Sequence, residues 1–247
     1  MKVESYIQSL PIQEFAGTPE GIAIFADRPA LQDAVAAFAT TGHEQSLDGY
    51  ERLGKGKRSE VFAVDDVAVK VSTQTTSERR LPSGRRVPDE LVEQFTYMTA
   101  LNSYLYRRPD YQVSTPKQYV ALKIDNGSSL LVQQRMRDIQ PLSDWIITHR
   151  NPANPWQESD IKHAARRRIT AAVGDVTLRL GLSDLYMPFP DILHAGNVLV
   201  PQQTDTPTKG PLCIIDQPRR NVHGQSAIRL AAWRLQLLRQ SPVVRYQ

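Results

Sequence analysis

The chain has 247 residues, of which 40% are hydrophobic and 23% are charged, and its net charge is +4. This length suits one two-lobed domain with a sizeable core, and the composition is ordinary for a globular protein. The single Cys213 excludes an internal disulfide framework and a four-cysteine zinc site. No apolar run approaches the roughly 18 residues that suggest a membrane span. Residues 1–15 make a poor signal peptide, so a cytoplasmic protein is expected.

The first part of the chain predicts one helix followed by strands. Leu31, Val35 and Phe38 recur at helical spacing before Gly42, which predicts a helix over 29–41. The strands that follow are expected to end near Leu53 and to cover 61–64 and 67–71.

The rest of the chain predicts mostly helices. Pro88 is expected to open a long helix, and Asp125-Asn126-Gly127 predicts a turn between strands over 119–124 and 129–134. Further helices are expected over 141–150, 160–180 and 226–240, and a strand pair over 198–201 and 211–215. Early strands and late helices indicate an α+β protein with two lobes.

A glycine-containing hairpin followed by a strand lysine is the first candidate for chemistry. Gly54 and Gly56 lie between the first two strands, and Lys70 lies in the third. Glycines let a hairpin approach a phosphate chain closely and point backbone N–H groups at it. A lysine on the following strand can hold the phosphates. Two glycines alone are typical of an ordinary turn, whereas the lysine at this distance favours a nucleotide site.

Two further segments supply hard oxygen ligands. Asn197 enters the strand expected over 198–201, and Asp216 leaves the strand expected over 211–215. Amide and carboxylate oxygens at these positions suit Mg²⁺ or Mn²⁺ whose shell is completed by nucleotide phosphates. Each residue alone could equally be the polar cap of a strand end.

The order of these motifs resembles the protein-kinase-like superfamily, in particular minimal bacterial and phage Ser/Thr kinases and antibiotic phosphotransferases. Residues 53–61 and 67–71 are similar to the glycine-rich loop and the V-A-I-K strand. Residues 190–200 are similar to the family's H-x-D-L-H-x-G-N-[IV]-L loop, and the resemblance spans roughly 50–218.

The resemblance implies a two-lobed, protein-kinase-like α+β fold. Residues 1–48 would form an N-terminal helical extension, and residues 49–247 a minimal kinase-like domain. Within it, a β-rich N-lobe would cover about 49–136 and a reduced, mainly helical C-lobe about 137–247.

The resemblance also assigns ATP and Mg²⁺ (or Mn²⁺) as cofactors and gives roles to residues. Asp191 would be the catalytic base, and Lys70 would hold phosphates while paired with Glu93, with Glu90 as the other candidate. The metal ligands would be Asn197 and Asp216. The implied nucleotide contacts are Gly54, Lys55, Gly56, Lys57, Ser59, Val61, Ala68, Lys70, Gln134 and Met136.

One spacing departs from the family pattern. Asp191 lies six residues before Asn197, where the family spacing is five, and Ile192 stands at the family position. Pro190 replaces the arginine of H-R-D, which predicts activity without prior phosphorylation. The shifted aspartate leaves a pseudokinase open as an alternative.

The leading hypothesis is a minimal serine/threonine protein kinase that transfers the γ-phosphate of ATP to a protein hydroxyl. The alternatives are a small-molecule phosphotransferase and a pseudokinase that acts as a nucleotide-binding or interaction module. From Arg219 onward there are six arginines and no acidic residue. This counts against an acidic insert for cationic substrates, although a solvated basic helix face would look the same. The expected partners are a protein substrate and ATP, with no membrane and no nucleic acid. A bacterial or phage-infected cytoplasm is expected, and delivery into a host cell as an effector stays open.

Overall fold

A computed structural model describes most of the chain. The described residues are 3–55, 59–72, 90–149, 153–154, 157–179, 195–204, 207, 209–215 and 244–246, with the backbone alone described at 90–94, 195 and 244–246. The chain divides into two compact units. Unit 1 comprises 1–97, 117–135 and 241–247, and unit 2 comprises 98–116 and 136–240.

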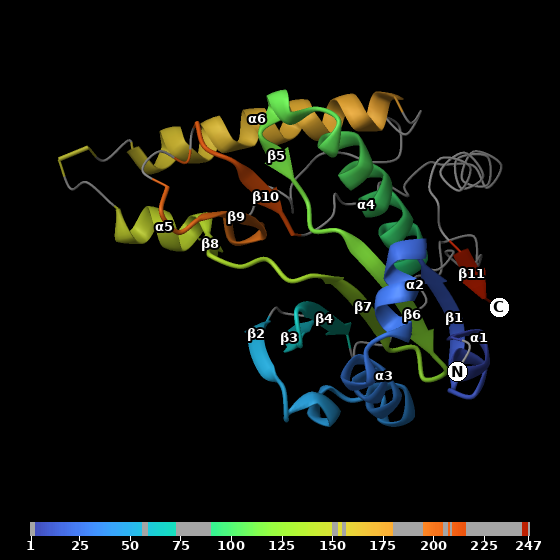
Figure 1. Ribbon diagram of the computed structural model, residues 1–247. Coiled ribbons are helices and arrows are strands. Elements are labelled where there is room, and N and C mark those ends of the chain that lie inside the picture. Colours follow the sequence, from blue (N-terminus) through green and yellow to red (C-terminus); the bar gives the residue numbers. More distant parts are fainter. Residues whose placement is uncertain are drawn as a thin grey trace, which may run out of the picture. The chain divides into compact units, whose positions relative to one another are not determined.

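Unit 1 is built on a seven-stranded sheet with the order β11-β1-β6-β7-β4-β3-β2 (Figure 1). All of its neighbouring strands run antiparallel. The strands are β1 (Ile12–Gly17), β2 (Glu51–Lys55), β3 (Glu60–Val64), β4 (Val67–Ser72), β6 (Gln118–Ile124), β7 (Ser129–Gln134) and β11 (Val244–Tyr246).

Helices α1 (Val3–Gln8), α2 (Pro19–Ala26) and α3 (Pro29–Thr41) supply side chains to the main core of unit 1. Phe25 from α2 and Phe38 from α3 are buried in the same cluster as the strand residues Phe15, Val69 and Val132. The other face of the sheet carries Ala16, Ala121 and Leu131, which pack with Phe95 of α4 (Glu90–Tyr106). Successive strand residues such as Phe15 and Ala16 point to opposite faces of the sheet, and both faces are covered by helices.

Residues 3–48 differ from the helical extension that the sequence suggested. They contain α1, α2 and α3 but also β1, which lies inside the sheet between β6 and β11. The expected helix over 29–41 is confirmed as α3, and Gly42 ends it in the left-handed conformation with φ of 68°. Glycine adopts this conformation without the steric cost that a side chain incurs.

Unit 2 combines a four-stranded sheet with helices. The sheet order is β5-β10-β9-β8, and only the β5–β10 pair among its described strands is parallel. Its strands are β5 (Val113–Ser114), β8 (Ile139–Pro141), β9 (Val198–Pro201) and β10 (Leu212–Ile214), and its helical segments include α5 (Leu142–Thr148), α6 (Gln157–Arg179), η2 (Pro109–Tyr111) and η3 (Ala195–Asn197).

The long helix α6 confirms the helix expected over 160–180 and begins three residues earlier. Its buried residues recur at helical spacing, among them Ile161, Ala165, Ile169, Ala172 and Val176. This stripe faces the interior of unit 2, so the polar residues between its members lie toward solvent. No helix among the residues that the structure describes is long and apolar enough to span a membrane.

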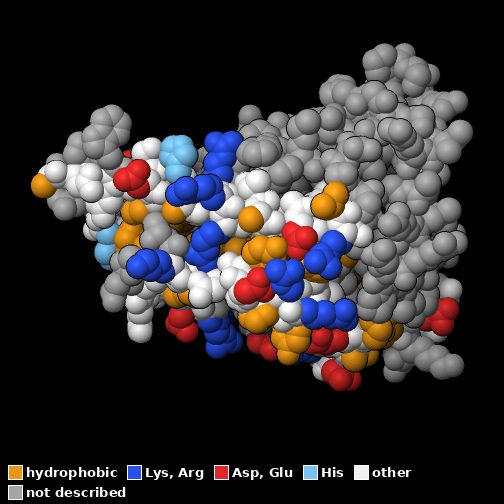
Figure 2. Space-filling view, turned by 90° about the horizontal axis from the view of Figure 1, so that it is seen from above, with side chains coloured by type: hydrophobic (Ala, Val, Ile, Leu, Met, Phe, Trp, Pro, Cys, Tyr) orange, Lys and Arg blue, Asp and Glu red, His pale blue; other side chains and the backbone are white. Residues whose placement is uncertain are grey.

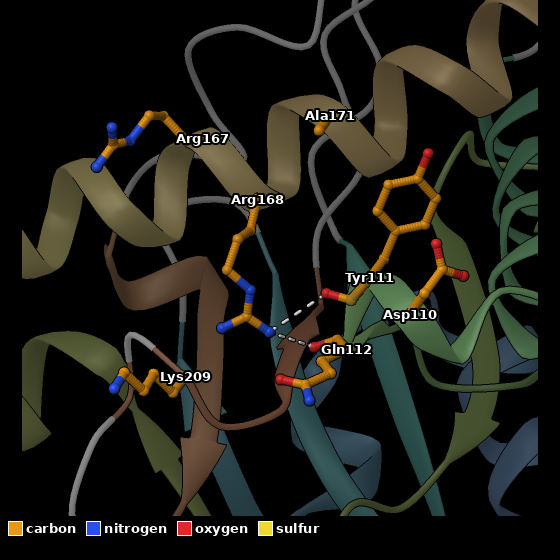
Figure 3. A pocket seen from close by; sticks show the side chains of 7 residues that line it. All are labelled: Asp110, Tyr111, Gln112, Arg167, Arg168, Ala171 and Lys209. Carbon is orange, nitrogen blue, oxygen red and sulfur yellow. Dashed lines mark hydrogen bonds between the residues drawn. The ribbon is translucent and has the colours of Figure 1, made fainter.

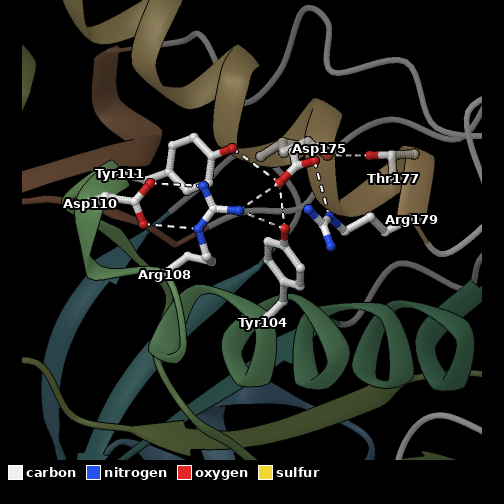
Figure 4. Close-up of polar contacts among 8 residues, drawn as sticks. Tyr104, Arg108, Asp110, Tyr111, Asp175, Thr177 and Arg179 are labelled. Atoms are coloured by element: carbon white, nitrogen blue, oxygen red, sulfur yellow. Dashed lines mark hydrogen bonds and ion pairs between the residues drawn. The ribbon is translucent and has the colours of Figure 1, made fainter.

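A polar cluster around Asp175 connects α6 to the end of α4 and to η2 (Figure 4). The Asp175 carboxylate accepts hydrogen bonds from the hydroxyl groups of Tyr104 and Tyr111. Arg108 and Arg179 also donate to it, at 3.3 and 3.2 Å. Several polar groups from three segments therefore meet at one carboxylate, which fixes their relative placement in unit 2.

Taken together, the described residues form an α+β structure. The N-terminal part is rich in strands and the long helix α6 lies in the later part. The expected strand pairs β3–β4, β6–β7 and β9–β10 are all confirmed as antiparallel pairs. The helix expected over 226–240 lies outside the described residues.

Candidate functional site

Lys70 lies in the middle of the unit 1 sheet. Across the strands it is directly opposite Val61 on β3 and Leu131 on β7. Directly opposite residues in a sheet point to the same face, and Leu131 belongs to the cluster that includes Phe95 of α4. The Lys70 side chain therefore starts from the α4 face and not from the face covered by α1, α2 and α3.

Two other predicted nucleotide contacts share this face. Val61 is opposite Lys70, and Ala68 precedes Lys70 by two positions on the same strand, so all three project to one side. Ala68 is buried, whereas Val61 and Lys70 are half-buried. Their combination is a primary amine beside two small apolar side chains, which suits a phosphate chain next to a flat apolar ring.

Gly54 lies at an irregular point of the hairpin that precedes this row. It is opposite Val61, and the pairing of β2 with β3 shifts register between Arg52 and Gly54. A Cβ atom at Gly54 would have no neighbour within 4 Å. The space beside this backbone is therefore open.

Lys55 does not join Lys70, because its side chain starts from the opposite face of the sheet. Lys55 is opposite Glu60, and Glu60 is opposite the buried Val71. The Lys55 ammonium lies 2.5 Å from the Glu60 carboxylate, and Arg52 lies 3.1 Å from it. The hydrogen bond from Lys55, and then the charge of Arg52, hold the pKa of Glu60 below its usual value.

Glu60 is a charged residue of the β2–β3 hairpin that was not predicted from the sequence to have a role. Its side chain is buried, although it stands in a strand with Val61, Phe62, Ala63 and Val64. A buried carboxylate is retained where cations neutralise it. The sequence could have indicated this ion cluster, because Glu60 begins an otherwise apolar strand and follows a strand that contains the basic residues Arg52 and Lys55.

The segment that would contact adenine begins at Gln134, the last residue of β7. The backbone N–H of Gln134 donates to the carbonyl of Lys117 at 2.8 Å. The Gln134 side chain accepts from the backbone N–H of Lys117 at 3.3 Å. The backbone N–H of Gln134 therefore already donates a hydrogen bond within the protein. Met136, two residues later, is half-buried and is the first residue of the 136–240 segment of unit 2.

In unit 2, Asn197 ends η3 and directly precedes β9. Its backbone carbonyl accepts a 3.1 Å hydrogen bond from the backbone N–H of Ile215, which follows β10. Antiparallel pairing of β9 with β10 thus brings position 197 next to the residue that precedes Asp216 in the sequence. The predicted metal ligand Asn197 therefore lies beside Ile215, whereas Asp216 lies outside the described residues.

Several predicted site residues lie outside the described part of the chain. They are Gly56, Lys57, Asp191 and Asp216, together with the side chains of Glu90 and Glu93. Ser59 is described and is half-buried just before β3. Among the described residues no group of three or more His, Cys, Asp and Glu side chains is placed to hold a metal ion.

Comparisons with known proteins add little to this geometry. No family model and no curated protein matches the sequence. Among solved structures, the chain is similar to WaaP in complex with acyl carrier protein, with 14% identity and a TM-score of 0.39. The similarity covers 81% of this chain and 74% of that chain.

Proposed function

We propose that the chain is an ATP-dependent phosphotransferase with a two-lobed, protein-kinase-like fold. The observation that carries the proposal is the placement of Lys70, Val61 and Ala68 on one face of adjacent strands. They follow an irregular hairpin at Gly54, and the sequence later supplies Asn197 and Asp216. The specific form that we favour is a minimal serine/threonine protein kinase.

The proposed roles in unit 1 follow from the chemistry of each side chain. Lys70 would hold phosphate oxygens of ATP through its charge. Val61 and Ala68 would cover the adenine ring. Because the Gln134 N–H is bonded to Lys117, that N–H would not contact adenine.

The proposed roles in unit 2 concern metal and proton transfer. Asn197 and Asp216 offer an amide and a carboxylate oxygen, which fit Mg²⁺ or Mn²⁺, and the metal would neutralise phosphate charge. Asp191 would orient the acceptor hydroxyl and take its proton as the γ-phosphoryl group moves from ATP to the hydroxyl oxygen. Catalysis of this kind is mainly positioning and charge neutralisation.

Transfer of label from [γ-³²P]ATP tests the proposal. Wild type, Lys70→Met and Lys123→Met would be incubated with ATP, Mg²⁺ and candidate proteins. Lys123 is a matched control, because it starts from the same sheet face as Lys70 through the pairs Lys123–Ser129 and Ser72–Ser129. We expect labelling by wild type and Lys123→Met and none by Lys70→Met. Equal labelling by Lys70→Met and wild type would contradict the assignment.

The same experiment separates the alternatives. Label on a small hydroxyl or amine compound, and not on protein, indicates a small-molecule phosphotransferase. Binding of ATP without transfer to any acceptor indicates a pseudokinase. Absence of both ATP binding and transfer contradicts the nucleotide site itself.

A further inference from the structure

A hollow in unit 2 lies between α6 and the segment from η2 to β5 (Figure 3). Its volume is about 530 Å³, and it is a shallow hollow that is wide open to solvent. Arg167 and Arg168 line it from α6, and Lys209 lines it from the loop before β10. Figure 3 shows Arg168 directed toward Tyr111 and Gln112, while Arg167 and Lys209 extend in different directions. Asp110, Tyr111 and Gln112 line the other side.

The part of the lining that the structure describes has more cationic than anionic side chains. Its carboxylate, Asp110, is held by Arg108 through two hydrogen bonds of 2.9 and 2.8 Å. In the part of the chain that the structure describes, neither Arg167 nor Lys209 has a hydrogen-bond or ion-pair partner. These two cations can therefore bind an anion without first breaking a contact within the described protein.

Arg168 is fixed in place within the same wall. Its guanidinium donates to the backbone carbonyls of Gln112 and Tyr111 at 2.9 and 3.3 Å. Burial lowers the pKa of Arg168, but a guanidinium stays protonated in proteins. These contacts with backbone carbonyls orient the Arg168 guanidinium.

The surrounding surface has the same sign. On α6, Lys162, His163, Arg166 and Arg167 are exposed, and no Asp or Glu occurs between Asp160 and Asp175. On the face that Figure 2 shows, Lys and Arg side chains occur together with Asp and Glu side chains. A basic surface around a basic hollow raises the local concentration of anions.

We propose that this hollow binds a small ligand that carries a phosphate group. A phosphate offers several strong acceptor oxygens on one atom, and guanidinium and ammonium groups of the kind that line this hollow bind such oxygens. Arg167 and Lys209 would contact the phosphate, and Arg168 would form the fixed part of the wall. The described lining belongs to unit 2, so the proposal does not rest on the nucleotide site.

Calorimetry with inorganic pyrophosphate tests the proposal on the full chain. All proteins would carry Lys70→Met, so that binding at the proposed nucleotide site is weakened. The added variants are Arg167→Glu, Lys209→Glu and, as a control, Arg107→Glu. Arg107 is exposed and does not line the hollow, so its replacement changes the net charge equally. Thermal unfolding would verify that each variant is folded.

We expect Arg167→Glu and Lys209→Glu each to weaken pyrophosphate binding by about tenfold or more, as for loss of a charge-assisted contact. Arg107→Glu should change it by less than about twofold. Equal weakening by all three variants, or no binding by the Lys70→Met parent up to about 10 mM, overturns the proposal. Binding of an oligonucleotide or an acidic peptide without pyrophosphate binding also overturns it.

A sugar phosphate as second probe identifies the source of the phosphate. Tighter binding of the sugar phosphate than of pyrophosphate indicates an organic phosphate whose remainder fills the hollow. Tighter binding of pyrophosphate indicates an inorganic ligand. Both results support the proposed class, provided that Arg167→Glu and Lys209→Glu weaken the stronger of the two.

Discussion

The hydroxyl group of Tyr111 donates a 3.0 Å hydrogen bond to the carboxylate of Asp175 (Figure 4). The backbone carbonyl of the same tyrosine accepts from Arg168 of the hollow. Tyr111 therefore belongs both to the polar cluster around Asp175 and to the wall of the proposed phosphate site. A change in the cluster should thus also move the wall.

Asp175→Asn should lower the free energy of unfolding at neutral pH. It should also make that free energy fall less steeply as the pH drops below about 4. Hydrogen bonds from Tyr104 first, and then from Tyr111 and Arg179, hold the pKa of Asp175 below its ordinary value. A lowered folded-state pKa stabilises the fold above the unfolded-state pKa of about 4, and this contribution is lost as the pH falls through the folded value. Urea unfolding at neutral pH and below pH 4 measures both effects.

Asp160→Asn is the matched control for that experiment. Asp160 lies in the first turn of the same helix and is exposed. Its replacement removes the same charge from the same helix without touching the polar cluster around Asp175. A slope that is unchanged in Asp175→Asn would contradict the role given to the cluster.

Two glycine-to-alanine changes should have opposite effects. At Gly21 of α2 a Cβ atom would lie 2.0 Å from the backbone carbonyl oxygen of Tyr119 on β6. Helix and strand would have to separate, so Gly21→Ala should cost about 3 kcal/mol or more. At Gly174 of α6 a Cβ atom would meet nothing within 4 Å, so Gly174→Ala should stabilise by about 0.5–1 kcal/mol. Denaturant unfolding of both variants would show these signs, and equal effects would contradict the packing of α2 on β6.

Cys213 should be unreactive in the folded protein. Burial raises the pKa of its thiol to about 12, against a small opposing effect of a hydrogen bond with Ser114. At pH 8 the thiolate fraction is then lower than that of a free thiol, whose pKa is about 8.5, by a factor of roughly a thousand. A disulfide reagent should label Cys213 quickly in denaturant and very slowly without it. Rapid native labelling would contradict the burial of β10.

Asp216→Ala should impair Mg²⁺-dependent ATP binding more than Asn197→Ala, if the proposed function holds. Asp216 would contribute a full negative charge to the metal, whereas Asn197 contributes only a dipole. Calorimetry of ATP binding with and without Mg²⁺ measures the difference. Equal affinity for ATP with Mg²⁺ in wild type and Asp216→Ala would contradict the proposal that Asp216 is a metal ligand.

Asp191→Asn tests whether the shifted aspartate is the catalytic base. The change keeps the size of the side chain and removes its charge, so kcat should fall by about a hundredfold or more. Asp184→Asn, a nearby aspartate outside the loop motif, should keep its activity. Full activity in Asp191→Asn together with loss in Asp184→Asn would assign the role to the other residue.

Much of the local structure could be predicted because its signals lie in adjacent residues. Helix α3 follows from apolar residues at helical spacing and from Gly42, whose left-handed conformation ends it. The β6–β7 pair follows from two apolar segments around a turn at 125–127. The shared face of Ala68 and Lys70 follows from the period of two in a strand. These features depend only on local backbone conformation and on the pattern of residues close together in the sequence.

Only the tertiary structure decided which distant residues meet. Strand β1 pairs with β6 more than a hundred residues later, and its short apolar pattern does not specify that partner. The register of β2, β3 and β4 places the side chains of Lys55 and Lys70 on opposite faces of the sheet. Arg167 and Lys209 line one hollow because packing of α6 brings their two segments together. Such contacts form when a common core is buried, and a local pattern does not contain the identity of the partner.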